Sequence, residues 1–552
     1  MQVDDFVADC AALQGAVEGG GSGAQELFLR ARLGYKRFEW AAEYFEPTAS
    51  KIVNGPPVQE VELSGQVIEP SGLQVIEGYL FPRYDSSRKM DLLKQLQRIT
   101  AACSKYKTRW ANIDILDWQV FDATKLEVFR IMTLGITGFD DPLTQRSMAE
   151  SAAGLEGVKG VFAFYPDERL AGRFDSAIRY LTTNADFNTF NRAEFITKYC
   201  NPLTTDISGL ESTLKIAVTR YNRLLNQDAP TLFDTNAFNV NAYVPDYSSF
   251  LSREKVALGK ALFADPALSG DGTRSCQSCH QPGKAFTDGL VKNTVIGEHQ
   301  LLRRNTPTLI NAALQPSQFY DLRVNTLEDQ SQAVVQNILE MHGSMNLSVK
   351  RLWQDTLYRA LFAAAFPRKG RAGIDTLEIM NAIGSYVRSL VSLNSRFDEY
   401  MRGNAAAMST AEINGFNLFM GKAKCATCHY MPLFNGTFPP RFIKSEAEVI
   451  GVPEDLAGRR IDPDMGRYEV IKVESFRHAF KTPGLRNVAR TGPYMHNGVF
   501  TSLEQVVDFY NKGGGVGLGL KIDNQTLPFD KLDLTIKERA DLVAFMKCLD
   551  SK

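Results

Sequence analysis

Two pentapeptides of the chain repeat one order of cysteines and histidine: Cys276-Gln277-Ser278-Cys279-His280 and Cys425-Ala426-Thr427-Cys428-His429. The two thiols of each run lie about one helical turn apart, so both can reach the vinyl groups of one porphyrin while the adjoining histidine binds its iron. A zinc site would need a second pair of cysteines or histidines near each run, and no such pair is present. The spacing therefore predicts two covalently bound haem c groups with axial histidines.

The composition excludes some classes of partner. The chain has 552 residues, with 62 Lys and Arg against 63 Asp and Glu, so its net charge of −1 offers no overall field to nucleic acid or an anionic membrane. No nucleic-acid partner is expected. A chain of this length is too long for one core and predicts about three or four modules.

The first residues give no sign of a secretory leader. Met1-Gln2-Val3-Asp4-Asp5 is acidic where a leader is basic, and no run of about 18 apolar residues predicts a transmembrane segment. Covalent haem attachment in bacteria takes place outside the cytoplasmic membrane. We therefore expect a periplasmic protein whose signal peptide is absent from this sequence.

Four cysteines lie outside the haem runs: Cys10, Cys103, Cys200 and Cys548. An oxidising compartment would allow them to pair, and Cys103 with Cys200 is one candidate pairing. Small buried side chains are the alternative, and the sequence alone does not decide between the two.

Residues 1–235 carry no haem run and are predicted to form an all-helical domain. Apolar residues recur at intervals of three and four in these stretches: 24–33, 88–107, 121–134, 170–182 and 207–226. The domain faintly resembles helical extracytoplasmic domains of imelysin type, whose iron motif needs a histidine. The first histidine of this chain is His280, so we assign the domain no chemistry, and docking of a partner stays open as its role.

The rest of the chain divides into two similar halves. A helix start at Ser252 precedes the first haem run, and a helix start at Ser409 precedes the second, each followed by a break that contains glycine. This weak internal repeat gives a first lobe, 245–405, and a second lobe, 406–552. The expected fold class is mainly α, with two cytochrome-c-like haem lobes and the N-terminal all-helical domain.

From about residue 245 to 552 the chain resembles the bacterial di-haem cytochrome c peroxidases, including their MauG-type relatives. Besides the haem runs, five segments match in family order: 304–308, 318–323, 340–341, 481–487 and 491–498. The resemblance implies an oxidoreductase that reduces hydrogen peroxide through high-valent haem iron at the first haem and passes electrons through the second. The implied partner is a small electron-donor protein, a cytochrome c or a cupredoxin, and a homodimer stays open.

The resemblance assigns the peroxide chemistry to Glu340, with Gln330 in support. Cleaving a bound peroxide requires moving a proton from the near oxygen to the far one, and a carboxylate in a partly dry pocket can do both steps. The apolar neighbours of Glu340, Ile338 and Leu339 among them, favour a raised pKa. The alternative is an exposed glutamate at a helix end.

Tyr320 matches the tryptophan that the family places between its haems, and Leu322 matches a usual glycine. A phenol relays an electron only if its proton also moves. Tyr320 therefore either takes part in proton-coupled transfer or is a packed interface aromatic. The two departures indicate a reshaped gap between the haems.

The distal ligand of the second haem separates the branches of the family. Plain peroxidases use methionine there and the MauG-type branch uses tyrosine, and the matching residue of this chain is Tyr510. A hard phenolate stabilises ferric and ferryl iron, whereas a soft thioether favours ferrous iron. If Tyr510 is only a packed side chain, Met495 or Met465 is the alternative ligand.

The resemblance also implies one calcium ion between the lobes, held by oxygens of Asn305, Thr491 and Pro493. His299 lies in the loop where some family members cap the first iron, although slightly out of register. The Tyr510 assignment favours an open, five-coordinate first haem instead. The remaining candidates, His478 and His496, are expected to be hydrogen-bonded core histidines rather than ligands.

Two rival functions stay open. A MauG-type enzyme would direct the oxidising equivalents onto a protein or aromatic substrate, with the N-terminal domain as a docking surface. A non-enzymatic di-haem electron carrier would instead need both irons fully ligated, and only His299 is placed for that at the first haem.

Overall fold

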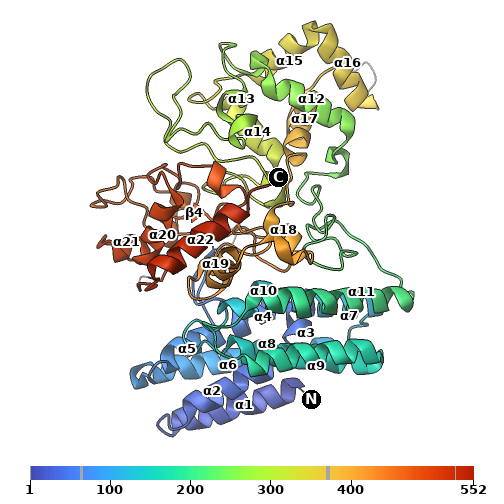
Figure 1. Cartoon of the computed structure of the whole chain (residues 1–552), viewed down its shortest axis with the longest axis vertical. Coiled ribbons are helices and arrows are strands. Elements are labelled where there is room, and N and C mark those ends of the chain that lie inside the picture. Colours follow the sequence, from blue (N-terminus) through green and yellow to red (C-terminus); the bar gives the residue numbers. More distant parts are fainter. Residues whose placement is uncertain (1, 62–65, 368–372, 529, 552) are drawn as a thin grey trace.

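The structure, a computed structural model, describes residues 2–61, 66–367, 373–528 and 530–551. Its regular elements are nearly all helices, and the described strands form two short antiparallel pairs. Figure 1 shows three tiers along the long axis: the N-terminal helices at the bottom, the second haem lobe in the middle and the first haem lobe at the top. This architecture confirms the predicted fold class.

The N-terminal region is helical, as predicted, apart from the short strands β1 (Glu60–Val61) and β2 (Val67–Ile68). The predicted helix over 207–226 is too long, because α11 ends at Thr213 and Lys215 then turns the chain with φ 56°. The α-helices are α1 (Gln2–Glu18), α2 (Ala24–Lys36), α3 (Glu39–Phe45), α4 (Pro47–Asn54), α5 (Leu73–Leu80), α6 (Lys89–Trp110), α7 (Asp117–Thr133), α8 (Ser147–Val161), α9 (Glu168–Thr183), α10 (Arg192–Phe195) and α11 (Asn201–Thr213).

A group of charged side chains is buried inside these helices. Lys36 donates to Glu39 at 3.0 Å and to Asp140 at 2.5 Å. Arg130 donates to the same Asp140 at 2.9 Å. All of these side chains are nearly inaccessible, so each charge depends on its partners rather than on water. We define the N-terminal ion cluster as Arg32, Lys36, Glu39, Glu127, Arg130, Asp140 and Glu150.

A capped helix precedes each haem run, as predicted. Ser252 caps α12 (Arg253–Ala264), its hydroxyl accepting from the backbone N–H of Lys255 at 3.2 Å. Ser409 caps α19 (Thr410–Met420) in a reciprocal pair with Glu412. Because both helix starts satisfy otherwise unpaired backbone donors, they fix the entry to each haem lobe.

Each of these helices crosses a second helix at a glycine. α12 packs on α17 (Thr376–Arg388), and a Cβ at Gly259 would lie only 1.9 Å from the carbonyl oxygen of Ala382. α19 packs on α22 (Ile536–Cys548), and a Cβ at Gly415 would lie 2.0 Å from the carbonyl oxygen of Asp541. Both crossings therefore require glycine, and the two lobes share one plan.

The other elements of the lobes are short. The first lobe adds α13 (Cys276–Cys279), α14 (Leu327–Gln336), α15 (Met345–Gln354) and α16 (Thr356–Ala365). The first lobe ends with α18 (Arg396–Met401), which packs in the core of the second lobe. The second lobe contains α20 (Leu503–Asn511), α21 (Gly514–Gly517), β3 (Ala447–Glu448) and β4 (Phe480–Lys481). Long irregular segments join them and carry most of the candidate site residues.

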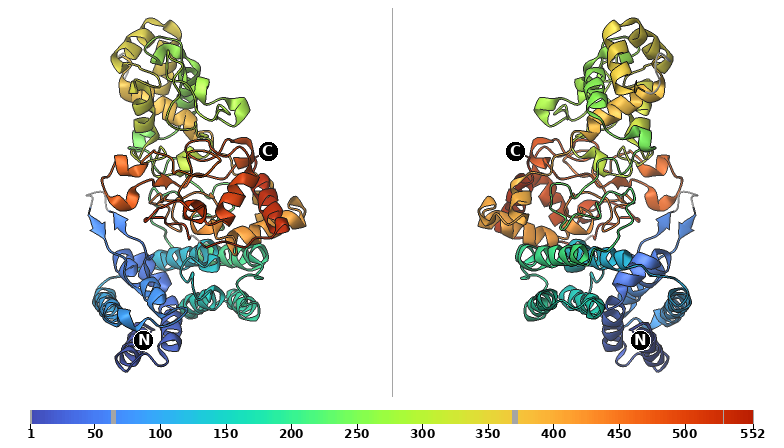
Figure 2. Two further views of the ribbon diagram at one scale, coloured as in Figure 1. Left: turned by 90° about the vertical axis from the view of Figure 1, so that its left-hand side faces the viewer. Right: turned by 90° about the vertical axis from the view of Figure 1, so that its right-hand side faces the viewer.

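The N-terminal region is built into the second lobe. One hydrophobic core runs from residues 121–238 into residues 397–549. Phe139 packs against Tyr430 and Phe438, with ring centroids 6.1 and 5.6 Å apart. The two side views of Figure 2 show the second lobe resting on the N-terminal helices, with the first lobe held away from them. Contacts of the N-terminal region therefore reach the residue that directly follows His429.

No helix in the described ranges is long and apolar enough to cross a membrane. All eight cysteines are unpaired, so the structure contains no disulfide between Cys103 and Cys200. Cys103 packs in one core cluster with Cys10, whereas Cys200 belongs to the core shared with the second lobe.

Candidate haem sites and the seam between them

The first haem run occupies the single turn of α13 and ends at His280. Nδ1 of His280 lies 3.0 Å from the carbonyl oxygen of Phe286, so this nitrogen carries the ring proton and donates it. Burial lowers the pKa of His280, against backbone hydrogen bonds to Phe286 and Pro307 and the charge of Asp288. A neutral imidazole with one nitrogen oriented and the other free is the form that binds iron.

The histidine of the second haem run is also oriented by a backbone carbonyl, although the run forms a different turn. Cys425–Thr427 forms a 3₁₀ turn, after which Nδ1 of His429 donates to the carbonyl oxygen of Pro483 at 3.0 Å. Burial lowers the pKa of His429 to about 4. Four unpaired thiols and two oriented, neutral imidazoles fit two haem c groups.

Glu340 lies in the turn after α14, partly buried. Asn337 Nδ2 donates to Glu340 Oε1 at 2.6 Å. Burial raises the pKa of Glu340, against the opposing charges of Arg323 and Arg274. Burial also raises the pKa of Cys279 to about 11, with the negative charge of Glu340 adding to this shift. The carboxylate therefore lies within electrostatic range of the first haem run.

Gln330 lies on α14, one helix before Glu340, and is half-buried. Its side-chain amide makes no hydrogen bond with the described residues, so it is free to contact a ligand. No hydrogen bond joins Gln330 to Glu340 in the described chain. Their pairing is implied by the family pattern and stays a prediction.

Tyr320 lies where the two lobes meet. Its carbonyl oxygen accepts from the backbone N–H of Lys481 in β4 at 2.7 Å. Burial raises the pKa of its phenol, the nearby charge of Arg304 lowers it, and that of Asp288 raises it. Leu322, where the family pattern has glycine, adopts φ 57°, a left-handed conformation that costs an L-residue energy. The segment therefore keeps the left-handed backbone that a glycine would adopt without strain, although it carries leucine there.

Tyr510 lies on the last turn of α20 and is directed toward the second haem run. Burial raises the pKa of its phenol, and the charges of Cys428 and Cys425 add to the shift. Tyr510 and these two thiols therefore share one buried environment. Of the alternative ligands, Met465 is half-buried and its carbonyl accepts from the backbone N–H of His478 at 3.0 Å, while Met495 sits in a turn with φ 71°.

Asn305, one of the three calcium candidates, contacts the segment that carries the other two. The backbone N–H of Asn305 donates to the carbonyl of His496 at 2.7 Å, which ties it to the segment that carries Thr491 and Pro493. Asn305 Nδ2 donates to the carbonyl of Leu290 at 2.8 Å, leaving its side-chain oxygen available. Among the described residues no group of three or more His, Cys, Asp or Glu could hold a metal ion, so a cation here would depend on amide and carbonyl oxygens.

Two further histidines, His478 and His496, are hydrogen-bonded to the protein, as expected, and within the described residues His299 is not. His478 Nδ1 lies 2.8 Å from the carbonyl of Asp464, and His496 Nε2 lies 3.2 Å from Asp462 Oδ1. The His496 ring stacks on Phe480 with centroids 3.7 Å apart. His299 is exposed on its loop.

Charged side chains from both lobes meet beside Tyr320. Arg304 donates to Asp464 at 2.7 Å and to Asp321 at 2.6 Å, joining the second lobe to the first. Arg467 Nη1 donates to the carbonyl of Asp321 at 2.9 Å. We define the inter-lobe seam as Arg303, Arg304, Asp321, Arg323, Asp464, Arg467, Glu469 and Lys481. No sequence pattern predicts this seam, although the segments 304–308 and 481–487, which match the family, contribute residues to it.

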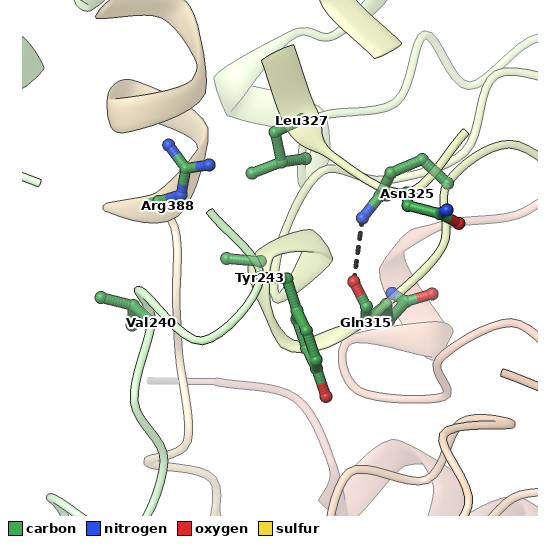
Figure 3. Close-up of a pocket in the computed structure, with 8 residues that line it drawn as sticks. Val240, Tyr243, Gln315, Asn325, Leu327 and Arg388 are labelled. Carbon is green, nitrogen blue, oxygen red and sulfur yellow. Dashed lines mark hydrogen bonds between the residues drawn. The ribbon is translucent and has the colours of Figure 1, made fainter. Parts of the chain in front are cut away.

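Figure 3 shows a cavity at the start of the first lobe. Tyr243 and Val240 of the segment before the first lobe line it together with Gln315, Leu327 and Arg388. Its polar groups are mostly engaged, since Gln318 donates to the carbonyl of Gln315 at 3.1 Å. The cavity contains none of the predicted site residues.

Comparison with known proteins agrees with this arrangement. Residues 253–406 match the family model described as di-haem cytochrome c peroxidase. Methylamine utilization protein MauG of Methylorubrum extorquens is 38% identical over 302 residues, which cover 55% of this chain and 80% of that protein. A cytochrome-c peroxidase of Denitromonas iodatirespirans is 33% identical over 317 residues, 54% of this chain and 82% of that protein.

Among solved structures, a MauG-like protein associated with microbial copper homeostasis shares 30% identity with a TM-score of 0.49, covering 56% of this chain and 94% of its own. The two haem runs, their oriented histidines and the sequence relatives lead to one assignment. The chain belongs to the di-haem cytochrome c peroxidase family, which includes the MauG proteins, and two haem groups are its cofactors.

Proposed function

We propose that this protein is a periplasmic peroxidase that reduces hydrogen peroxide at the haem of His280, with Glu340 as the proton carrier. The observation that supports this most is the partly buried Glu340 carboxyl, whose pKa burial raises, within electrostatic range of the first haem run. In this proposal residues 245–405 form the peroxidatic lobe and 406–552 the electron-transfer lobe. Residues 1–235 form the N-terminal helical domain, whose core continues into the electron-transfer lobe and whose role stays open.

The residues around Glu340 perform the proton transfer. Haem iron, when bound, supplies the redox chemistry. Glu340 takes a proton from the incoming hydrogen peroxide and returns it to the far oxygen, which leaves as water. Asn337 holds Oε1 at 2.6 Å, so Oε2 is the oxygen available to the proton, and Gln330 supports the peroxide through its free amide. Two electrons and two protons complete the conversion of one hydrogen peroxide to two waters.

The second lobe supplies those electrons from a small donor protein, a cytochrome c or a cupredoxin. Tyr510 is the proposed distal ligand of the second haem, since it shares the buried environment of Cys425 and Cys428. Tyr320 lies between the sites as the proposed relay. A calcium ion bound by Asn305, Thr491 and Pro493 would hold the lobes in register.

Replacing Glu340 with Gln tests the proposal, because glutamine keeps the bond from Asn337 but cannot carry the proton. We expect peroxide turnover to fall by about 10²-fold or more, the usual contribution of a general acid–base, with two haems still bound. Steady-state turnover with a reduced cytochrome c measures the change. Glu254→Gln, an exposed glutamate of α12, is the matched control. Unchanged turnover in Glu340→Gln would rule out the proton-carrier role.

A second candidate is oxidation of a protein or aromatic substrate, as the name of the MauG relative suggests. Tyr510 favours it, because a phenolate ligand would let the second haem share oxidising equivalents instead of only delivering electrons. A Tyr510→Met variant separates the two functions. Peroxidase turnover with a cytochrome donor should persist in it, whereas oxidation of an aromatic substrate without added reductant should be lost.

A further inference from the structure

Lys481 has an ammonium group without an ionic partner. In the described part of the chain no carboxylate oxygen lies within 4.0 Å of its Nζ. The charge that acts on it most is that of Asp321, but Arg304 and Arg323 already bind that carboxylate at 2.6 and 2.8 Å. Burial lowers the pKa of Lys481 to about 8, against the charge of Asp321. An anion that approached this ammonium group would stabilise its charged form.

The whole inter-lobe seam has the same imbalance. Its five cations face the three anions Asp321, Asp464 and Glu469, an excess of two positive charges, and the charge of Glu446 acts on Arg467 from outside the seam. Arg467 is the second underpaired cation, because among the described residues its guanidinium donates only to the carbonyls of Asp321 and Leu322, at 2.9 and 3.2 Å. Burial lowers the pKa of Arg467 as well. An anion from outside the polypeptide would offset this excess of positive charge.

Lys481 also lies on the short path between the two haem sites. Its backbone N–H donates to the carbonyl of Tyr320 at 2.7 Å, and two residues later the carbonyl of Pro483 accepts from His429 Nδ1 at 3.0 Å. On the first-lobe side, the charge of Asp288 acts on both Tyr320 and His280. The backbone around Lys481 therefore connects the residue between the lobes, Tyr320, with the axial histidine candidate of the second haem.

We propose that Lys481 binds a haem propionate in this gap, with Arg467 beside it, and that its charge stabilises the reduced state of the haem it contacts. The propionates are carboxylates that arrive with the cofactors, so they supply the missing anion without a further ligand. The proposal depends on the two haems of the proposed function but not on peroxide chemistry. A peroxidase test and a test of Lys481 can therefore fail independently.

Lys481→Met removes the positive charge and keeps a side chain of similar length, whereas Lys481→Arg keeps the charge. We expect the midpoint potential of at least one haem to fall in Lys481→Met, by a three- to tenfold change in its redox equilibrium, about 30 to 59 mV. Lys481→Arg should stay near the wild-type value. Lys472→Met is the control, since Lys472 is an exposed lysine of the same lobe lying over the Tyr468 ring, where solvent screens its charge.

Spectroelectrochemical titration of the haem-loaded proteins gives these potentials, and the haem content of each variant is measured beside them. Both potentials unchanged in Lys481→Met with two haems bound would overturn the proposal. A fall that appears only in phosphate or chloride buffer would assign the site to a free anion and would also overturn it.

If Lys481→Met does not load both haems, a structure of the haem-loaded wild type decides. We expect Nζ of Lys481 within about 3 Å of a propionate oxygen, the distance of a charge-assisted hydrogen bond. An Nζ bound to solvent or to Asp321 alone would contradict the proposal.

Discussion

The N-terminal ion cluster and the inter-lobe seam contain the same residue types with opposite balance. In the cluster every cation has a carboxylate within 3.0 Å: Arg32 with Glu150, Lys36 with Glu39, and Arg130 with Glu127. In the seam Lys481 and Arg467 have none. Buried cations that are all paired with carboxylates can be explained by the stability of the fold alone. A group with more cations than carboxylates indicates that an anionic ligand is missing. Burial of charge by itself therefore does not identify a functional site.

The largest expected effect is on the cluster. Lys36→Met leaves Glu39 and Asp140 with one cation fewer, and breaking a buried pair on one side costs about 3–5 kcal/mol. We expect the urea transition of the N-terminal helices, followed by circular dichroism, to shift by that amount. Arg37→Met is the control, because Arg37 pairs with Glu156 at 3.2 Å on the surface, with both side chains more than 40% exposed. Equal effects of the two variants would contradict a self-contained cluster.

A smaller effect is expected in the seam. Arg304→Met removes bonds to Asp464 and Asp321, but Arg303 and Arg323 remain on these carboxylates at 3.1 and 2.8 Å. We therefore expect a loss of about 1.5–3 kcal/mol, the value of hydrogen bonds to charged groups, measured by the same urea titration. A loss of stability as large as that of Lys36→Met would contradict the excess of cations over carboxylates in the seam.

The smallest expected effect is the dependence of the free energy of unfolding on pH that Glu43 causes. Burial raises the pKa of Glu43, which lies beside the cluster, from 4.5 to about 7. Between these values the folded protein keeps a proton that the unfolded chain has lost, so stability falls as pH rises, by at most about 1.4 kcal/mol per pH unit. Glu43→Gln should flatten this slope in urea titrations at pH 5, 6 and 7. Stability that rises with pH across this window would exclude a protonated Glu43.

The sequence predicts what depends on local spacing. The haem runs and the helix starts at Ser252 and Ser409 follow from short motifs whose geometry needs no distant partner. The helix expected over 207–226 is wrong beyond Thr213, because Leu224 and Leu225 reach the shared core from an irregular segment. Tertiary packing overrides a periodic pattern there.

What the sequence could not predict depends on residues far apart in the chain. Lys36 and Glu39 have the spacing of an ordinary surface pair. Their ion pairs with Asp140 and Arg130, which lie far along the chain, are visible only in the structure. Arg304 and Asp464 meet in the seam across 160 positions, so no local pattern reveals them. The placement of Tyr510 and Tyr320 came from the family pattern, and their roles stay predictions.

Mixing the di-ferric, haem-loaded protein with hydrogen peroxide in a stopped-flow spectrometer is the most direct test of peroxide chemistry at the His280 haem. The wild type should change its Soret absorption within the mixing experiment, without prior reduction, and Glu340→Gln should change it at least about 10²-fold more slowly. A wild-type spectrum that stays constant until a reductant is added would contradict an open first haem served by Glu340.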